Sequence, residues 1–174
     1  MKLNRLHQAY VWLRRISHCR GFGIQSPTDY SFVRYVINEQ WPYYAYEQLT
    51  GDDWLKQKLG KLYMRLSNWR QPSAMLQDEY LPYWQAGCRS TAFSACVDRV
   101  ELARVDIHDR EGWDVLVARC DDQSVLVVES IWKDWNRWNE IIADARTSVT
   151  FDLYYCGIVF FDQNRYKQNY KINF

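Results

Sequence analysis

The stretch SVLVVES, residues 124–130, constrains the fold of this chain more than any other. Its run of four aliphatic residues is typical of a strand buried on both faces of a sheet. A second strand is predicted shortly before it, at VELARVDI, residues 100–107. If the two strands are parallel neighbours, a crossover of a dozen or more residues must join them. The connecting segment therefore decides the fold of this half of the chain.

That segment, DREGWDVLVARCDDQ at residues 109–123, fits two structures. Its apolar residues follow the stripe of an amphipathic helix, whereas WDVLVA alone would fit a strand. A strand here would leave only about five residues for a parallel crossover, which is too few. We therefore expect a helix and an ordinary right-handed strand–helix–strand unit, with a hairpin as the alternative.

The rest of the chain changes character at Pro72. Residues 1–70 are predicted to form a helical N-terminal extension. In its first helix, at 2–19, the residues Leu6, Tyr10 and Leu13 share one apolar face. Further helices are predicted at 30–38, 41–49 and 52–69, the first of them preceded by a cap and a proline at Ser26 and Pro27.

Residues 71–174 are predicted to alternate between short strands and helices, as in an α/β domain. Strands are expected at 73–76, 91–97, 148–155, 157–162 and 169–174, in addition to the two already named. Helices are expected at 133–145 and at 78–88, the latter interrupted by Pro82.

Composition sets the remaining limits. With 174 residues, 48% hydrophobic and 25% charged, the chain is predicted to be globular. A net charge of +1 gives no general electrostatic reason to expect nucleic acid as a partner. The five scattered cysteines contain no C-x-x-C, and no apolar run approaches the ~20 residues of a membrane span. The N-terminal residues lack the continuous apolar segment of a secretory signal, so we expect a cytoplasmic protein without a membrane partner.

Three stretches together carry a family resemblance: RGFGIQSPTDYSFVRYVINEQWPYYAYEQL, GKLYMRLSNWRQPSAML and VTFDLYYCGIVFFDQNRYKQNYKINF. They resemble the N-terminal extension, the entry into the cofactor loop and the closing hairpin of a class I S-adenosylmethionine-dependent methyltransferase family of Bacteroides-type bacteria. The resemblance implies a reduced Rossmann-like sheet with helices on both faces. It also implies a C-terminal antiparallel hairpin and the helical extension over residues 1–70.

The cofactor loop departs from the family pattern. Where the family has a glycine-rich turn after its first strand, this chain has Gln77, Asp78 and Glu79, and the next glycine is Gly87. Side chains and carboxylates in this turn oppose the close approach of a cofactor's carboxylate or ribose. The chain also lacks counterparts of a later family motif and of one strand–helix unit, so we expect no cofactor to bind.

If S-adenosylmethionine does bind, the candidate cofactor-binding residues are Asp78, Asp98 and Glu129. Asp98 follows the second strand, where a ribose-binding carboxylate is expected, and Glu129 ends the central strand. The alternatives are a turn acid paired with Arg99 for the first, and an acid capping the next helix for the second. No catalytic nucleophile is predicted.

Two other clusters have competing interpretations. Asp106, His108, Asp109 and Glu111 could hold a divalent cation, but a helix cap in a solvated turn is the preferred interpretation. The basic residues of the first helix, Arg14, Arg15 and Arg20 among them, could contact RNA or form a solvated face.

The sequence favours a methyltransferase-like protein that has lost S-adenosylmethionine binding and serves as an interaction or scaffolding protein with a protein partner. An active, divergent methyltransferase is the alternative, and nucleic-acid binding through the basic helix is a weaker one.

Overall fold

The computed structural model describes residues 5–49 and 53–174, which group into two compact units. The helical unit comprises the described residues up to Trp69 together with Tyr80–Arg89 and Lys171–Phe174. The sheet unit comprises Arg70–Glu79 and Ser90–Tyr170. Each unit therefore takes more than one segment of the chain. The boundary predicted at residue 70 remains a prediction.

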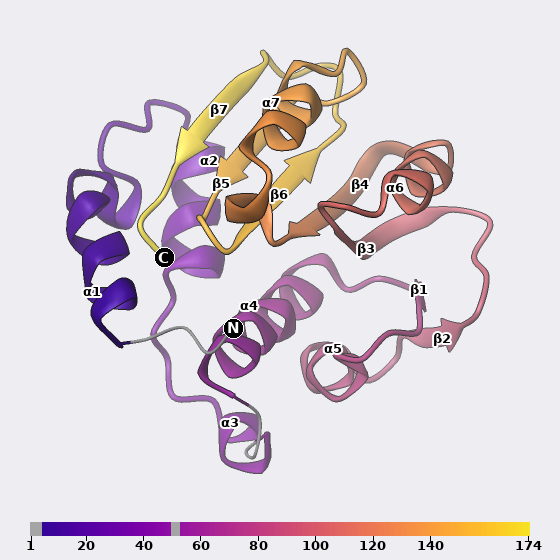
Figure 1. The fold of residues 1–174 in the computed structure, drawn as a ribbon. Coiled ribbons are helices and arrows are strands. Elements are labelled where there is room, and N and C mark those ends of the chain that lie inside the picture. Colours follow the sequence, from indigo (N-terminus) through magenta and orange to yellow (C-terminus); the bar gives the residue numbers. More distant parts are fainter. Residues whose placement is uncertain (1–4, 50–52) are drawn as a thin grey trace. The chain divides into compact units, whose positions relative to one another are not determined.

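Helices dominate the first unit, as the sequence predicts (Figure 1). In chain order the elements are α1 (Arg5–Arg14), the 3-10 segment η1 (Ile16–Gly21), α2 (Pro27–Phe32), the π-helical segment η2 (Val33–Ile37), α3 (Ala45–Gln48), α4 (Trp54–Arg70) and α5 (Leu81–Gly87). The cap predicted for α2 is confirmed: the Ser26 hydroxyl accepts a hydrogen bond from the Asp29 backbone N–H, and Pro27 occupies the first turn.

The core of the helical unit lies between α4 and α5. The rings of Tyr63 and Trp84 stack with centroids 4.6 Å apart, and both side chains are fully buried. The Ser67 hydroxyl donates to the Trp84 carbonyl over 2.8 Å. Pro82 stands in the first turn of α5, where a missing N–H costs nothing, so the predicted interruption at this proline is wrong.

The first helix buries a different face from the one its apolar spacing predicts. Leu6, Tyr10 and Leu13 are more than half exposed, whereas Val11 and Arg15 are buried. The Arg15 guanidinium donates from Nε and Nη2 to the Ile172 carbonyl, at 3.1 and 2.9 Å. The returning C-terminal segment thus satisfies this arginine.

The sheet unit contains a five-stranded mixed sheet in the order β3-β4-β6-β5-β7 (Figure 1). Its strands are β3 (Val100–Asp106), β4 (Cys120–Glu129), β5 (Val149–Asp152), β6 (Cys156–Phe160) and β7 (Gln168–Lys171). A second, two-stranded sheet pairs β1 (Ala74–Leu76) with β2 (Ala92–Ser94) in parallel. The mixed α/β class predicted from the sequence is confirmed.

The connection between β3 and β4 is a helical crossover, as predicted. β3 and β4 are parallel, and the segment between them forms helix α6 (Arg110–Val117), so the hairpin alternative is wrong. β6 lies antiparallel between β4 and β5, which confirms an antiparallel hairpin of β5 and β6 near the C-terminus. Its turn falls at residues 153–155, slightly before the predicted position at Cys156 and Gly157.

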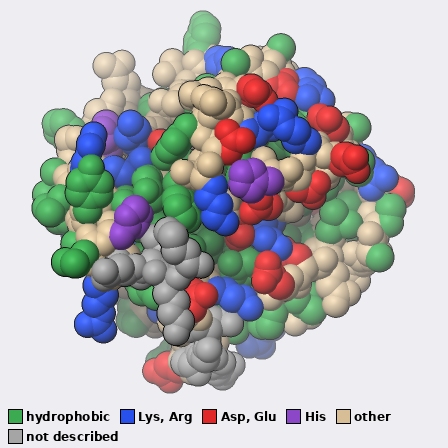
Figure 2. Space-filling view, in the orientation of Figure 1, with side chains coloured by type: hydrophobic (Ala, Val, Ile, Leu, Met, Phe, Trp, Pro, Cys, Tyr) green, Lys and Arg blue, Asp and Glu red, His purple; other side chains and the backbone are tan. Residues whose placement is uncertain are grey.

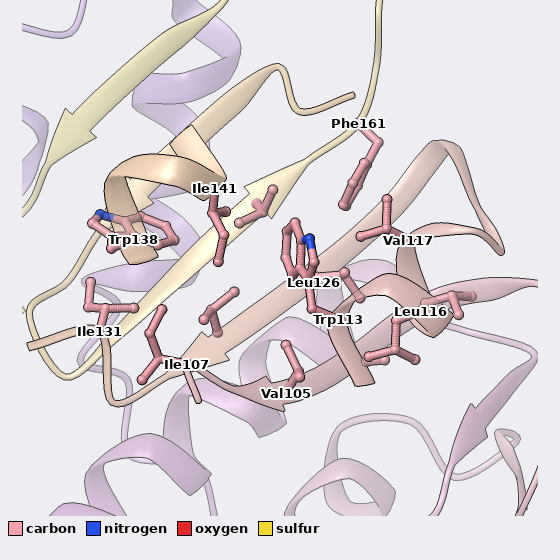
Figure 3. Packing of buried hydrophobic residues seen from close by; sticks show 14 of the residues in the cluster. Val105, Ile107, Trp113, Leu116, Val117, Leu126, Ile131, Trp138, Ile141 and Phe161 are labelled. Atoms are coloured by element: carbon pink, nitrogen blue, oxygen red, sulfur yellow. The ribbon is translucent and has the colours of Figure 1, made fainter. Parts of the chain in front are cut away.

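Helices α6 and α7 (Trp135–Ala143) cover one face of this sheet (Figure 3). Trp113 of α6 and Trp138 of α7 belong there to one buried apolar cluster that also includes Val105 and Leu126 of the strands. The residues of β3 and β4 that alternate with these point to the opposite face. That second set includes Arg104 and Glu129, and it leads to the candidate site.

Candidate functional site

The candidate site lies where β1 and β3 run side by side in the sheet unit. At the start of both strands, the Ser73 backbone N–H and hydroxyl donate to the Glu101 carboxylate. At their far ends, Arg104 of β3 contacts Asp78, which follows β1. These two contacts show that the strands run in the same direction.

β1 pairs in parallel with β2 in the two-stranded sheet, and it also contacts β3 of the five-stranded sheet. In open α/β sheets, the crevice at the carboxyl ends of two such strands is where ligands bind. The residues at the ends of β1, β3 and β4 are therefore the ones to examine.

Arg104 and Glu129 share a face because of the register of β3 and β4. Arg104 pairs with Val127, and Glu129 lies two residues further along β4. Side chains two residues apart on a strand point to the same side of the sheet. The Arg104 side chain is thereby directed along the sheet surface toward the end of β4.

All three guanidinium nitrogens of Arg104 contact carboxylates. Nε donates to Asp78 Oδ2 over 3.1 Å, Nη2 to Glu79 Oε1 over 3.1 Å, and Nη1 to Glu129 Oε2 over 2.9 Å. The side chains of Arg104 and Glu129 are 16% and 11% exposed, whereas that of Glu79 is 59% exposed. We call these four residues the Arg104 network.

The Arg104 network joins the substituted loop to the central strands by charge-assisted hydrogen bonds. Its four side chains carry a net charge of −2, one guanidinium against three carboxylates. A carboxylate that binds a ribose must have a free oxygen facing the sugar. In this structure Asp78 directs Oδ2, and Glu129 directs Oε2, at Arg104.

The structure brings together two of the three predicted residues, Asp78 and Glu129. Asp98 lies exposed in the connection between β2 and β3, and no contact described for it reaches the Arg104 network. The cap proposed as the alternative role of Glu129 is wrong, because Asp134 caps α7 by accepting from the Arg137 N–H.

No protein-family model, curated protein or solved structure matches this chain. The function must therefore be argued from the site itself.

Sequence reasoning missed Arg104, the centre of the site. One signal was available, since an arginine inside an otherwise apolar strand is seldom buried unless it is paired. The sequence could not identify its partners, because they come from three separate strand ends. Glu79 was noted only as part of the loop.

Backbone strain marks the end of β4. Ser130 and Tyr154 both have positive φ angles, 62° and 72°, which are unfavourable for residues with side chains. The Ser130 N–H donates to the Tyr155 carbonyl over 2.8 Å, and Asp152 accepts from the Tyr154 N–H over 2.8 Å. Trp132 stacks on the Tyr154 ring with centroids 6.2 Å apart. Such strain often accompanies functional sites.

The cluster at residues 106–111 has a structural role. Asp109 caps α6 by accepting from the Gly112 N–H, and Asp106 accepts from the His108 N–H. Across the described residues, no group of three or more metal-ligating side chains is arranged to hold an ion. The preferred interpretation of this cluster as a helix cap is confirmed.

The basic first helix offers less surface charge than its sequence indicates. Arg15 is buried. The Arg14 guanidinium donates a hydrogen bond to the Tyr10 hydroxyl and lies over the Tyr10 ring. Figure 2 shows acidic and basic side chains close to one another over much of the visible face.

Among the described helices, none is both long and apolar enough to cross a membrane.

Proposed function

We propose that this protein is a methyltransferase-like protein that no longer binds S-adenosylmethionine and acts through contacts with a protein partner. The Arg104 network carries this proposal. It lies at the ends of β1 and β4, where the family resemblance would put the cofactor, and there Arg104 pairs with three carboxylates.

The strand arrangement supports descent from a Rossmann-like fold. β1 and β2 are parallel, β3 and β4 are parallel, and β1 lies beside β3 in the same direction. The antiparallel β6 between β4 and β5 agrees with the closing hairpin that the family resemblance implies. These strand pairs are consistent with a nucleotide-binding sheet whose first loop has changed.

Exposed apolar side chains of the helical unit support contacts with a protein partner. Leu6, Leu13, Ile16 and Phe22 are between 52% and 85% exposed, and they occur in α1, in η1 and directly after η1. Apolar side chains gathered on a surface are typical of protein–protein contacts. A protein partner that covers them would gain the hydrophobic free energy that the chain alone leaves unused.

Thermal melting with S-adenosylmethionine, and separately with its demethylated product, tests the loss of cofactor binding. A ligand at 100 times its dissociation constant would stabilise the fold by about 2.7 kcal/mol. We expect no change in Tm at millimolar ligand. A saturable rise in Tm with either compound would contradict the proposal.

Substitutions on α1 test the contact role. Leu6→Gln combined with Leu13→Gln should leave the Tm nearly unchanged, because both side chains are exposed. The same double variant should lose any protein that the wild-type chain retains specifically in a binding assay. A partner that binds both forms equally, or a wild-type chain that retains none, would contradict this part of the proposal.

One observation favours an active methyltransferase as a second candidate. Asp78 and Glu129 do converge on Arg104 from the carboxyl ends of β1 and β4, where an active enzyme would need them. In that case Arg104 would have to release them when the cofactor arrives. The melting experiment separates the two candidates, since only the active enzyme is stabilised.

A further inference from the structure

A pocket in the helical unit has a concentration of positive charge. Its volume is about 210 Å³, and its lining includes Lys58, Lys61 and Arg65 of α4. Asn38, Glu39 and Phe174 are also part of the lining. None of these residues belongs to the sheet unit, so the pocket is a separate site from the Arg104 network.

Arg65 is a buried cation, with only 7% of the residue exposed. Its Nε donates to the Val36 carbonyl over 2.6 Å, its Nη2 to the Ile37 carbonyl over 2.9 Å, and its Nη1 to the Tyr46 hydroxyl over 3.1 Å. All of these acceptors are neutral, and within the described residues Arg65 forms no ion pair. A buried charge normally has a charged partner, because neutral dipoles compensate it only in part.

The carbonyls that bind Arg65 come from the end of η2. This π-helical segment leaves the carbonyls of its last turn without partners along the helix, and Arg65 satisfies two of them. The arginine thus caps the segment while two of its five N–H groups remain for other acceptors. Short π-helical segments are frequent at functional sites.

Two lysines add charge on the same helix as Arg65. The Lys58 ammonium lies 4.2 Å from the centroid of the Phe174 ring, and the Lys61 ammonium lies 5.0 Å from that of Tyr46. Aromatic faces orient a cation without neutralising it. In the part of the chain that the structure describes, Lys61 forms no ion pair, so its charge is available to a ligand.

One carboxylate reduces the net positive charge of the pocket. Glu39 lies in the lining, and its Oε2 accepts a hydrogen bond from the Tyr43 hydroxyl over 2.6 Å. The charged side chains of the lining therefore sum to +2, three cations against one carboxylate. The amide nitrogen of Asn38 is buried and has no hydrogen-bond partner among the described residues, so it is a further donor for a ligand.

From these observations we infer that the pocket binds a phosphate group, either as the free ion or as a small phosphomonoester. A phosphate carries a charge of about −1.5 to −2 at neutral pH, which matches the lining. Lys61 acts as a point charge for its oxygens, and the remaining N–H groups of Arg65 are further donors in the lining. This inference does not depend on the function proposed for the sheet unit.

Calorimetric titration with inorganic phosphate, at constant ionic strength, tests the inference. The wild-type chain should show saturable binding. Lys61→Gln should weaken it about tenfold, the loss expected for one charge-assisted hydrogen bond. Lys133→Gln is the matched control, because it removes the same charge from a lysine that lies over the Trp132 ring in the sheet unit. It should bind like the wild type.

An Arg65 variant is less suitable, because it would also uncap η2 and could unfold the helical unit. Lys58→Gln provides a second test of the pocket without that risk. Absence of saturable binding to the wild type would overturn the inference, and so would an equal loss in Lys61→Gln and Lys133→Gln. Phenyl phosphate in a parallel titration distinguishes the two sources: tighter binding indicates a monoester, and equal binding the free ion.

Discussion

Arg104 is the residue on which the candidate site depends. It projects from the middle of β3 between buried neighbours, so its charge must be compensated inside the fold. The compensation comes from Asp78, Glu79 and Glu129, each bound by a different guanidinium nitrogen. The turn after β1, glycine-rich in the family that the sequence resembles, here supplies two of these three carboxylates.

Replacing Arg104 should destabilise the fold strongly. Arg104→Met leaves the mostly buried Asp78 and Glu129 carboxylates without their cation, at a cost of about 3 kcal/mol. Glu79→Gln is the comparison, and it should cost less than about 1 kcal/mol because Glu79 is largely exposed. Urea unfolding measures both. Similar losses for the two variants would show that Arg104 is not the centre of a buried network.

The cysteines should differ in reactivity. Burial raises the pKa of the Cys120 thiol from its ordinary value of 9.0 to about 11. The reactive thiolate of Cys120 is therefore scarce at neutral pH, and its alkylation should accelerate about tenfold for each pH unit. Exposed Cys96 should react with iodoacetamide well before Cys120.

Mass spectrometry of the labelled native chain gives the order of reaction. In urea the difference between the two thiols should disappear, because both become exposed. Equal labelling of Cys96 and Cys120 in the native chain at neutral pH would contradict the burial of Cys120.

At the scale of single residues, Glu129 was predicted because ligands of open α/β sheets bind at the carboxyl ends of strands, and Asp78 because it stands where the resembling family has its glycine-rich turn. The strand-end argument also predicted Asp98, which lies outside the Arg104 network. Arg104 was not identified because its partners depend on the register of β3 against β4 and on the position of β1. Neither quantity can be derived from the spacing of residues in one strand.

Among the elements, helix α6 could be predicted because a strand in its place would leave too few residues for the crossover between β3 and β4. The buried face of α1 could not be predicted from the sequence. Its apolar stripe predicted burial of Leu6 and Leu13, whereas the structure buries Val11 and Arg15. Arg15 is satisfied by Ile172, a residue at the other end of the sequence, and local periodicity contains no information about such a contact.

Strand β6 and helix α7 depend on the absence of a side chain at Gly157. A Cβ atom at this position would lie 2.2 Å from Cη2 of Trp138, which is almost fully buried. Gly157→Ala should therefore destabilise the chain by about 1–3 kcal/mol. Thermal or urea unfolding measures the change in the free energy of unfolding.

A double-mutant cycle tests the cause. Trp138→Phe removes the outer ring atoms that an added Cβ would meet. In that background Gly157→Ala should cost clearly less than in the wild type. An equal cost in both backgrounds would mean that the loss arises elsewhere in β6.

At the scale of the whole molecule, each of the two compact units is assembled from separated segments. Helix α5 belongs with α4 through the stacked rings of Tyr63 and Trp84, although it stands between β1 and β2 in the sequence. The change in the pattern of apolar residues at Pro72 predicted a helical part followed by an α/β part. Periodicity along the chain could not predict that residues 80–89 and 171–174 return to the helical unit.

The proposed function requires that the Arg104 network lies where a related methyltransferase would bind its cofactor. A crystal structure from crystals grown with millimolar S-adenosylhomocysteine, the demethylated product, tests it most directly. We predict that Arg104 will contact Asp78, Glu79 and Glu129 as described, with no ligand density at the ends of β1 and β3. Density for the ligand at this point, with Asp78 or Glu129 turned from Arg104 toward its ribose, would contradict the claim.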